Sequence, residues 1–245
     1  PNEETVEVVD TCSEGNGTVE EYSRWLSSID ECDWYGVSCA NGKVRGLELT
    51  ENNLIGAIPP EVGQLQFLQV LALNENCVYG SLPPEIGNMS NLQQLNLEYN
   101  GMSGFVPDEL FEVSSLVQLN LGWQYANDWN CTASDGSVVS TSYAQGNPEN
   151  GENLGLEGEI LGAKIGHLKY LKEITVNDNY FSGGIASEIG NLKQLGEYQS
   201  CAELVAFVYH ILTSSFCPAI LNAGSNSFSG TIPNEISNLR SLREM

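Results

Sequence analysis

The chain has 245 residues, which is enough for one or two ordinary domains or for a single repeat array. Asp and Glu number 32 against 9 Lys and Arg, so the formal net charge of -23 disfavours binding to nucleic acid or to anionic lipid. Hydrophobic residues make up 41 % of the chain, so global disorder is not expected, and no apolar run reaches the ~20 residues of a membrane span.

Residues 1–43 are predicted to form an acidic leading segment followed by a helical cap that contains cysteines. Thr18-Val-Glu-Glu21 has the pattern of a helix capping box. The hydrophobic residues that follow fall on one face of the expected helix: Val19, Tyr22, Trp25, Leu26 and Ile29. We expect a disulfide between Cys32 and Cys39, with Trp25 and Trp34 covering the open end of the core.

Residues 44–245 carry an internal repeat of the form L-x-x-L-x-L-x-x-N-x-L-x-G-x-I-P-x-x-I-G-x-L. Its first copies recur every 24 residues, at Leu47, Leu71, Leu95 and Leu119. Later copies occupy 171–192 and 221–239, and another begins at Leu242 and breaks off with the sequence. We therefore expect the chain to be a segment of a longer precursor, with any signal peptide or membrane anchor outside it.

Each repeat position has a physical role. The alternating leucines predict a short strand with one buried face, and successive strands are expected to stack ~4.8 Å apart into a parallel sheet. The Asn positions are expected to form a buried ladder that binds free backbone groups: Asn52, Asn76, Asn100, Asn179 and Asn226. Glycine after the strand suits a tight bend, and proline fixes the extended return path.

The motif Cys32-x-Trp34-x-Gly36-Val37-x-Cys39, followed by N-x-L-x-G-x-I-P repeats, resembles the plant-type leucine-rich repeat family. The resemblance covers residues 18–124 well and 154–245 with one large interruption. It implies a right-handed β/α solenoid with a parallel sheet on the concave face, a short 3-10 or irregular convex side, and an α-helical N-terminal cap. In that family the domain is usually the extracellular recognition part of a receptor-like kinase or receptor-like protein, and some members inhibit cell-wall enzymes.

Two insertions, near 124–153 and 196–220, interrupt the repeat. The first is either a loop that contacts a partner or a tolerated decoration, and the copy after it has Leu154 in place of Asn and Leu161 in place of Pro. The second is either a flap joined by a Cys201–Cys217 disulfide or a translated intron, because its removal nearly restores the repeat step.

No catalytic or metal-binding pattern is present in the sequence: there is no nucleophile elbow, no Cys–His constellation and no metal-type spacing. We therefore predict a non-catalytic protein without cofactor or metal. A kinase domain, if one follows, would lie beyond residue 245. His167 takes a convex, exposed repeat position, and Cys77 is a candidate partner for Cys131. Glycosylation motifs at Asn16, Asn88 and Asn130 favour the secretory route and an extracellular or cell-surface location.

Strand alternation predicts three columns of outward-facing residues. The first column is Glu48, Ala72, Asn96, Asn120, Thr175 and Asn222; the second is Thr50, Asn74, Glu98, Gly122, Asn177 and Gly224; the third is Glu51, Glu75, Tyr99, Trp123, Asp178 and Ser225. The predicted ligand contacts are Glu48, Thr50, Glu51, Asn74, Glu75, Asn96, Glu98, Tyr99, Asn120, Trp123, Thr175, Asn177 and Asp178. Aromatic residues are common anchors at binding surfaces, so Tyr99 and Trp123 among carboxylates suggest a cationic or amphipathic ligand.

The expected function is recognition of a peptide or protein ligand through the concave face, with a co-receptor as a further candidate partner. No nucleic acid or direct membrane contact is expected of this segment. The alternative is a structural or adhesive secreted protein whose acidic surface holds calcium or wall polymer, or an inhibitor of a wall enzyme.

Overall fold

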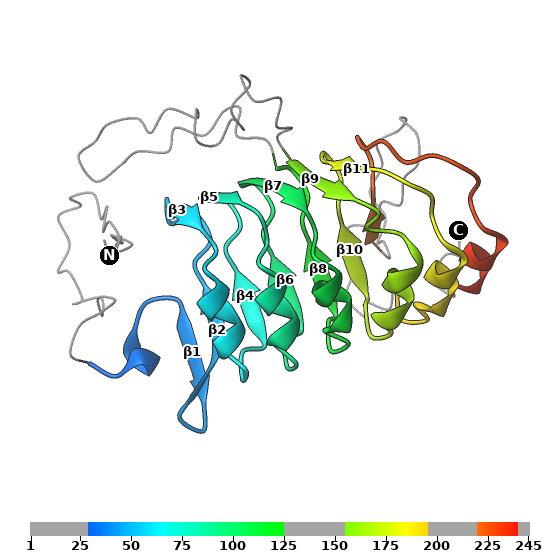
Figure 1. Ribbon diagram of the computed structural model, residues 1–245. Helices are drawn as coiled ribbons and strands as arrows, with labels where there is room; N and C mark the ends of the chain where they lie inside the picture. The colour runs from blue at the N-terminus through cyan, green and yellow to red at the C-terminus, as the bar shows by residue number, and fades with distance from the viewer. Residues whose placement is uncertain (1–28, 125–154, 196–219, 240–245) are drawn as a thin grey trace, which may run out of the picture.

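The computed structural model describes residues 29–124, 155–195 and 220–239, and its strands form two sheets (Figure 1). The larger sheet has the strand order β1-β2-β4-β6-β8-β10-β12, and every neighbouring pair in it is parallel except β1 with β2. Its strands are β1 Val37–Ala40, β2 Lys43–Glu48, β4 Val70–Ala72, β6 Gln94–Asn96, β8 Gln118–Asn120, β10 Glu173–Thr175 and β12 Ile220–Asn222.

The register of the larger sheet follows the leucine repeat. Leu47 pairs with Leu71, Leu71 with Leu95, and Leu95 with Leu119. The pairing continues across both insertions, because Leu119 lies opposite Ile174 and Ile174 opposite Leu221. The predicted parallel sheet is confirmed, and the insertions leave the stacking order intact.

A second, parallel sheet was not predicted from the sequence. It has the order β11-β9-β7-β5-β3 and consists of β3 Ile55–Ala57, β5 Cys77–Gly80, β7 Gly101–Phe105, β9 Gly155–Gly158 and β11 Tyr180–Phe181. These strands cover the segment after the ladder position, where Gly80 and Gly104 take φ values of 76° and 81° in the predicted bend. The return path is therefore hydrogen-bonded between turns rather than merely extended.

Short 3-10 helices form the convex side, as expected from the family resemblance. They are η2 Pro60–Gln64, η3 Pro84–Asn88, η4 Asp108–Glu112, η5 Ala163–His167, η6 Ser187–Asn191 and η7 Asn234–Asn238. Pro59, Pro83, Pro107 and Pro233 directly precede four of them with φ between -75° and -67°, the range that the proline ring imposes. Among the described residues no helix is long and apolar enough to cross a membrane.

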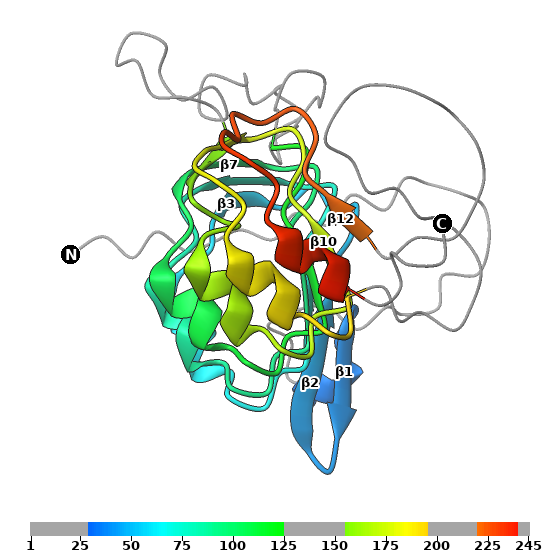
Figure 2. The ribbon, with the colours of Figure 1, turned by 90° about the vertical axis from the view of Figure 1, so that its right-hand side faces the viewer.

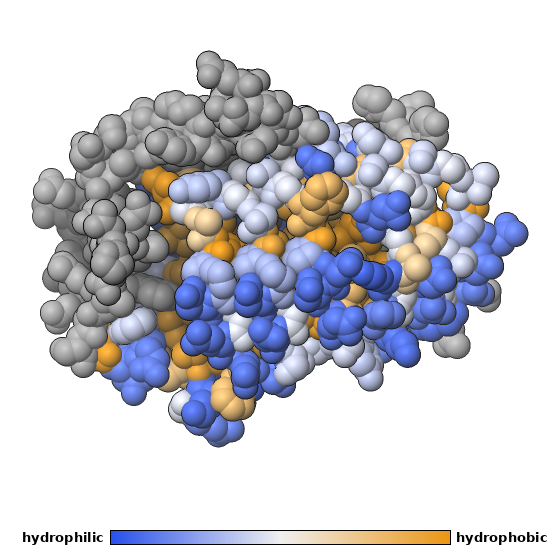
Figure 3. Space-filling view, in the orientation of Figure 1, coloured by the Kyte–Doolittle hydropathy of each residue, from blue (hydrophilic) through white to orange (hydrophobic). Residues whose placement is uncertain are grey.

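Seen along the solenoid, the described part of each turn has three sides: the larger sheet, the 3-10 helices and the smaller sheet (Figure 2). The repeat leucines fill the space between them, and Leu68, Leu95 and Leu119 are completely buried. Hydrophilic residues gather over the 3-10 helices on the convex side (Figure 3). One turn cannot enclose its own apolar residues, so each turn is stabilised by its neighbours.

The predicted buried asparagine ladder is confirmed at Asn76, Asn100 and Asn179, whereas Asn52 and Asn226, in the outer turns, are half-buried. The side-chain amide of Asn76 donates to the carbonyl oxygens of Leu49 at 2.7 Å and Leu73 at 2.9 Å, and its Oδ1 accepts from the backbone N–H of Leu54 at 2.9 Å. The same pattern recurs at Asn100 and Asn179. These bonds satisfy backbone groups that the tight turn would otherwise leave unpaired.

Gln124 occupies the ladder position of the turn that carries the first insertion. Its Nε2 donates to the carbonyl of Leu97 at 2.7 Å, and its Oε1 accepts from the backbone N–H of Met102 at 3.1 Å. From the sequence, Gln124 is expected to begin the insertion and Leu154 to hold the ladder position; Leu154 lies outside the described residues. A glutamine amide thus performs the asparagine role, and the turn resumes at β9 in register with β7.

The cap contains the predicted Cys32–Cys39 disulfide, which joins Cα atoms 5.5 Å apart. The expected helix over residues 18–29 lies almost wholly outside the described residues; the described part of the cap holds the 3-10 helix η1 Glu31–Asp33. Strand β1 was not predicted. It pairs antiparallel with β2 through the two-residue turn Asn41-Gly42, whose positive φ values of 54° and 63° match the hairpin preference for Asn-Gly.

The convex junction at the first insertion differs from the others. The residue before the last one of the helix is a glycine in η2 (Gly63) and in η3 (Gly87). A Cβ at Gly87 would lie 2.7 Å from the carbonyl oxygen of Glu109 in η4, so η3 and η4 pack closely. Phe111 holds this position in η4 and is buried. Because a phenyl ring needs far more room than glycine leaves, η5 cannot approach η4 as closely as η4 approaches η3.

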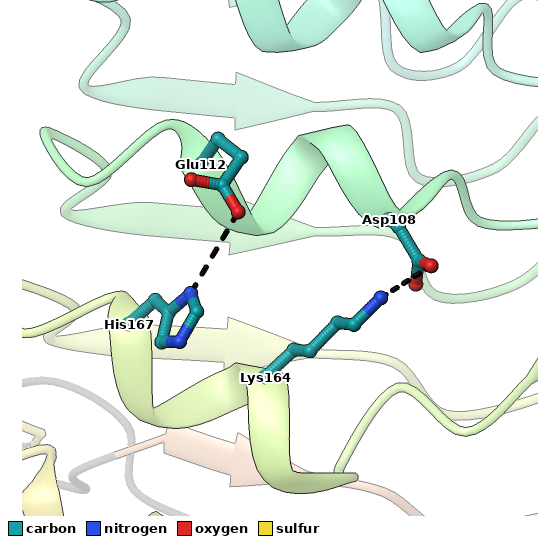
Figure 4. Close-up of polar contacts among 4 residues, drawn as sticks. All are labelled: Asp108, Glu112, Lys164 and His167. Carbon is teal, nitrogen blue, oxygen red and sulfur yellow. Dashed lines mark ion pairs between the residues drawn. The ribbon is translucent and has the colours of Figure 1, made fainter.

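Two ion pairs bridge that junction (Figure 4). Lys164 of η5 contacts Asp108 of η4, and His167 Nδ1 lies 3.9 Å from Glu112 Oε1. All four side chains are solvent-exposed. The repeat predicted an exposed, convex site for His167, and the structure places it there. Exposed ion pairs of this kind contribute only about 0–1 kcal/mol each, so the buried ring rather than the charges defines the junction.

Candidate binding surface on the strand face

The outward side of the larger sheet, here called the strand face, brings the predicted columns into register. Glu48 lies opposite Ala72, Ala72 opposite Asn96, Asn96 opposite Asn120, and Asn120 opposite Thr175. Backbone hydrogen bonds continue past the strand ends, from Glu75 N–H to the Glu98 carbonyl at 2.9 Å and from Trp123 N–H to the Asn177 carbonyl at 3.0 Å. The columns therefore form one continuous surface.

The third column has an unusual backbone conformation that the sequence did not reveal. Glu51, Glu75, Tyr99, Trp123, Asp178 and Ser225 all have positive φ, between 51° and 59°. This left-handed conformation costs non-glycine residues about 1–2 kcal/mol each, and the ladder and inter-turn hydrogen bonds hold it in place. Since the conformation is the same in each turn, successive side chains of the column leave the backbone in the same direction.

Tyr99 and Trp123 stack on each other within this column. Their ring centroids are 4.7 Å apart and the ring planes differ by 6°. This separation matches the strand spacing of about 4.8 Å, so the rings stack along the column. Both side chains are half-buried, and the carboxylates of the neighbouring turns, Glu75 and Asp178, flank the pair.

Carboxylates on the strand face raise one another's pKa. Burial, followed by the charges of Glu173 and Glu75, raises the pKa of Glu98 to about 7. Burial and a hydrogen bond shared with Glu51 raise the pKa of Glu75. The side-chain amide of Asn74, which donates to Glu75 Oε1 at 3.3 Å, has a smaller effect that lowers this pKa. Burial and the charges of Glu98, Glu75 and Asp178 raise the pKa of the Tyr99 hydroxyl. A cation placed here would relieve this repulsion.

Three of the predicted contacts are buried rather than exposed: Asn120, Thr175 and Asn177. The amide of Asn120 donates to Glu173 Oε1 at 3.0 Å, and the amide of Asn177 donates to Asp178 Oδ2. Asn177 occupies space that Gly122 leaves open, because a Cβ there would lie 2.8 Å from Asn177 Oδ1. Asn120 and Asn177 thus orient carboxylates, and direct ligand contact by the three buried residues remains a prediction.

The remaining predicted contacts are exposed or half-buried on the same face. Two further hydrogen bonds order them: Thr50 Oγ1 donates to Asn74 Oδ1 at 2.9 Å, and Asn96 Oδ1 accepts from Glu98 N–H at 3.2 Å. Glu48 and Glu51 add carboxylates in the first turn, and Asp178 adds one beside the turn of Trp123.

A further column was not predicted from the sequence; it lies one residue before the central leucine or isoleucine of each strand. It contains Gly46, Val70, Gln94, Gln118, Glu173 and Ile220, paired in register. Gln118 Nε2 donates to Glu173 Oε1 at 3.2 Å, so this column belongs to the same polar network. Side chains alternate between the two faces of a strand, so extending this alternation two residues before the first column would have predicted the additional column.

The strand face is rich in hydrogen-bond acceptors. Its columns contain no Lys, Arg or His, and the Oδ1 atoms of Asn120 and Asn177 are buried without a hydrogen-bond partner among the described residues. Within the described ranges no three His, Cys, Asp or Glu side chains are arranged to hold a metal ion. The surface is therefore suited to ligands that bring positive charge and hydrogen-bond donors.

The glycosylation and cysteine predictions are only partly within the described residues. Asn88 is exposed on η3, on the convex side and away from the strand face. Asn16, Asn130, Cys131, Cys201 and Cys217 lie outside the described residues.

Comparisons with known proteins agree with the repeat. Residues 91–112 and 219–239 match the Leucine Rich Repeat family. A stretch of 47 residues is 40 % identical to receptor-like kinase TMK4 from Arabidopsis thaliana. That stretch is 19 % of this chain and 5 % of the relative, so this chain corresponds to a small part of that kinase's length.

Solved structures share the solenoid. A chain from the crystal structure of the BIR3–SERK2 complex of Arabidopsis thaliana aligns with a TM-score of 0.56 at 20 % identity, over 86 % of each chain. A plant ice-binding protein aligns with a TM-score of 0.51 at 26 % identity, over 69 % of this chain and 46 % of the other. Since one architecture carries such different tasks, function has to be argued from the strand face.

Proposed function

We propose that this chain, a member of the leucine-rich repeat family, is a non-catalytic extracellular recognition domain that binds a peptide or protein ligand on its concave strand face. The domain would belong to a receptor-like protein or kinase, a proposal supported by the 40 % identity of a 47-residue stretch to a receptor-like kinase. A protein co-receptor is a further candidate partner, since a structure with the same fold comes from a complex of two proteins.

One observation carries the proposal: the in-register columns place a stacked aromatic pair within a continuous acidic surface. The buried positions of each turn are fixed by packing, so the strand face is where the sequence is free to vary for recognition. Six strands at a spacing of about 4.8 Å span about 24 Å, which accommodates about 7–8 residues of extended peptide.

The proposal is tested by selection from a library of random decapeptides with the full chain as bait. The double variant Tyr99→Ala, Trp123→Ala should lose the peptides that the unaltered chain enriches, because it removes the two largest side chains of the third column. Its melting temperature should remain close to that of the parent, since both rings are half-buried.

The matched control is the double variant Phe67→Ala, Tyr170→Ala, which removes two exposed aromatic side chains that precede core leucines and lie off the strand face. It should enrich the same peptides as the parent. Equal enrichment by all three proteins, or no enrichment by the parent, would contradict recognition through the strand face.

A further inference from the structure

The stacked pair has two distinct ends. Because Tyr99 and Trp123 stack along the third column, each ring turns one face toward the other ring and its opposite face toward the next turn. The next residue beyond Tyr99 is Glu75, and the next beyond Trp123 is Asp178, as the inter-turn hydrogen bonds show. Each end of the pair thus combines an aromatic face with a carboxylate.

The two ends differ in how firmly the orientation of the carboxylate is fixed. Asp178 accepts a hydrogen bond from the amide of the buried Asn177, which fixes its orientation. Glu75 also accepts a hydrogen bond from the amide before it, but that bond is 3.3 Å long and its donor, Asn74, is only half-buried. Burial, a hydrogen bond shared with Glu51 and the charge of Glu51 raise the pKa of Glu75. Asp178 is therefore the carboxylate whose orientation is better fixed, because its donor Asn177 is buried, and it lies one turn beyond the tryptophan, the aromatic side chain that binds cations most strongly.

Among the described residues, the columns of the strand face contain neither Lys nor Arg beside this position. A planar guanidinium can stack on an indole ring while it donates two parallel hydrogen bonds to a carboxylate, which an ammonium group cannot do. The combination of a ring face with an oriented carboxylate about one strand spacing away fits a guanidinium.

We propose that the Trp123 ring and the Asp178 carboxylate form a subsite for an arginine side chain of the ligand. This inference rests on the proposed function and names the ligand chemistry that the strand face selects. Asn177 acts as a positioning residue that orients Asp178, and Tyr99 supports the indole from its other side.

The test uses the full chain and the peptide acetyl-(Gly-Arg)4-amide, with titration calorimetry at physiological salt. Two matched peptides replace every arginine with lysine or with citrulline, the neutral isostere of arginine. The arginine peptide should bind at least several-fold more tightly than the lysine peptide, and the citrulline peptide should lose at least tenfold. Equal affinity for arginine and citrulline peptides would overturn the proposal.

Variants separate the subsite from general attraction to an acidic protein. Asp178→Asn and Trp123→Leu should each weaken the arginine peptide about tenfold and reduce its preference over the lysine peptide. Glu235→Gln, which makes the same charge change on the exposed convex helix η7, should have little effect. If Asp178→Asn behaves like Glu235→Gln, the subsite does not exist. Asp178→Asn preserves side-chain volume, so it remains informative if Trp123→Leu folds poorly.

The outcome also separates this inference from the proposed function. Library peptides that depend on Tyr99 and Trp123 but show no arginine requirement would refute only the guanidinium subsite. If neither library peptides nor the arginine peptide binds, recognition through the strand face is refuted as well.

Discussion

Glu98 shows how strongly a single residue depends on its neighbours. Its side chain lies in the second column, one turn from Glu75 and two turns from Glu173, and burial followed by the charges of Glu173 and Glu75 raises its pKa to about 7. Below about pH 4.5 this carboxyl is protonated in both the folded and the unfolded chain, so it causes no penalty. As the pH rises from about 4.5 to about 7, the unfolded chain gives up this proton while the folded chain keeps it. The free energy of unfolding therefore falls over this range, and the loss is complete once the pH has passed the folded pKa of about 7.

Glu98→Gln should therefore stabilise the protein at high pH. At pH 8 we expect the free energy of unfolding to rise by on the order of 2–3 kcal/mol relative to the parent, and at pH 5 by much less. Urea denaturation at the two pH values measures this difference. Glu109→Gln, an exposed change on η4, is the control and should show little pH-dependent gain. A constant difference for Glu98→Gln from pH 5 to pH 8 would contradict the raised pKa.

At the scale of the element, the distance between neighbouring 3-10 helices depends on the residue before the last one of each helix, which is Gly87 in η3 and Phe111 in η4. Gly87 lets η3 approach η4 closely, because a Cβ there would lie 2.7 Å from both the Glu109 carbonyl oxygen and the Glu109 Cβ. Phe111 at the corresponding site of η4 is buried and opens the next junction, which is the turn that carries the first insertion.

Gly87→Ala should destabilise the protein by about 1–3 kcal/mol, the usual cost of forcing an extra methyl group into a packed contact with backbone atoms. Chemical denaturation measures the change. Gly184→Ala is the matched control, because its nearest heavy atom, the Ser229 carbonyl oxygen, would be 3.5 Å from the new Cβ. We expect the control to be neutral, and similar losses in both variants would show that helix approach is not the cause.

For the whole molecule, the formal charge of -23 opposes the compact state, because carboxylates distributed over the stacked turns repel one another. Such repulsion acts over distances set by the salt concentration, with a Debye length of about 30 Å at 10 mM and about 10 Å at 0.1 M. Stability should therefore depend on ionic strength more than it does for a neutral domain.

Raising NaCl from about 10 mM to about 0.1 M should increase the melting temperature by about 3–5 °C, as screening weakens the repulsion. Differential scanning calorimetry measures the shift. A variant with Glu61, Glu109 and Glu235 all changed to Gln, each exposed on a convex helix, should respond less steeply. A melting temperature that does not change with salt would show that the net charge is not a significant destabilising factor.

The sequence alone determined the order of the turns and the identity of the leucines that point into or pack against the core. Leu47, Leu71, Leu95 and Leu119 are alike because each must fill the same space, so their period reports the stacking directly. The outward columns followed from the same alternation, which is a local property of a strand. The Cys32–Cys39 disulfide was likewise readable from its motif.

Only the tertiary structure decided features that depend on contacts between turns. Gln124 could enter the ladder because its backbone is held beside Leu97 and Met102, a position that the following insertion concealed in the sequence. The second sheet, the left-handed third column and the stacking of Tyr99 on Trp123 likewise arise from neighbouring turns rather than from local preference. Repetition specifies what each turn buries, whereas the surface that the turns build together depends on how their side chains meet in space.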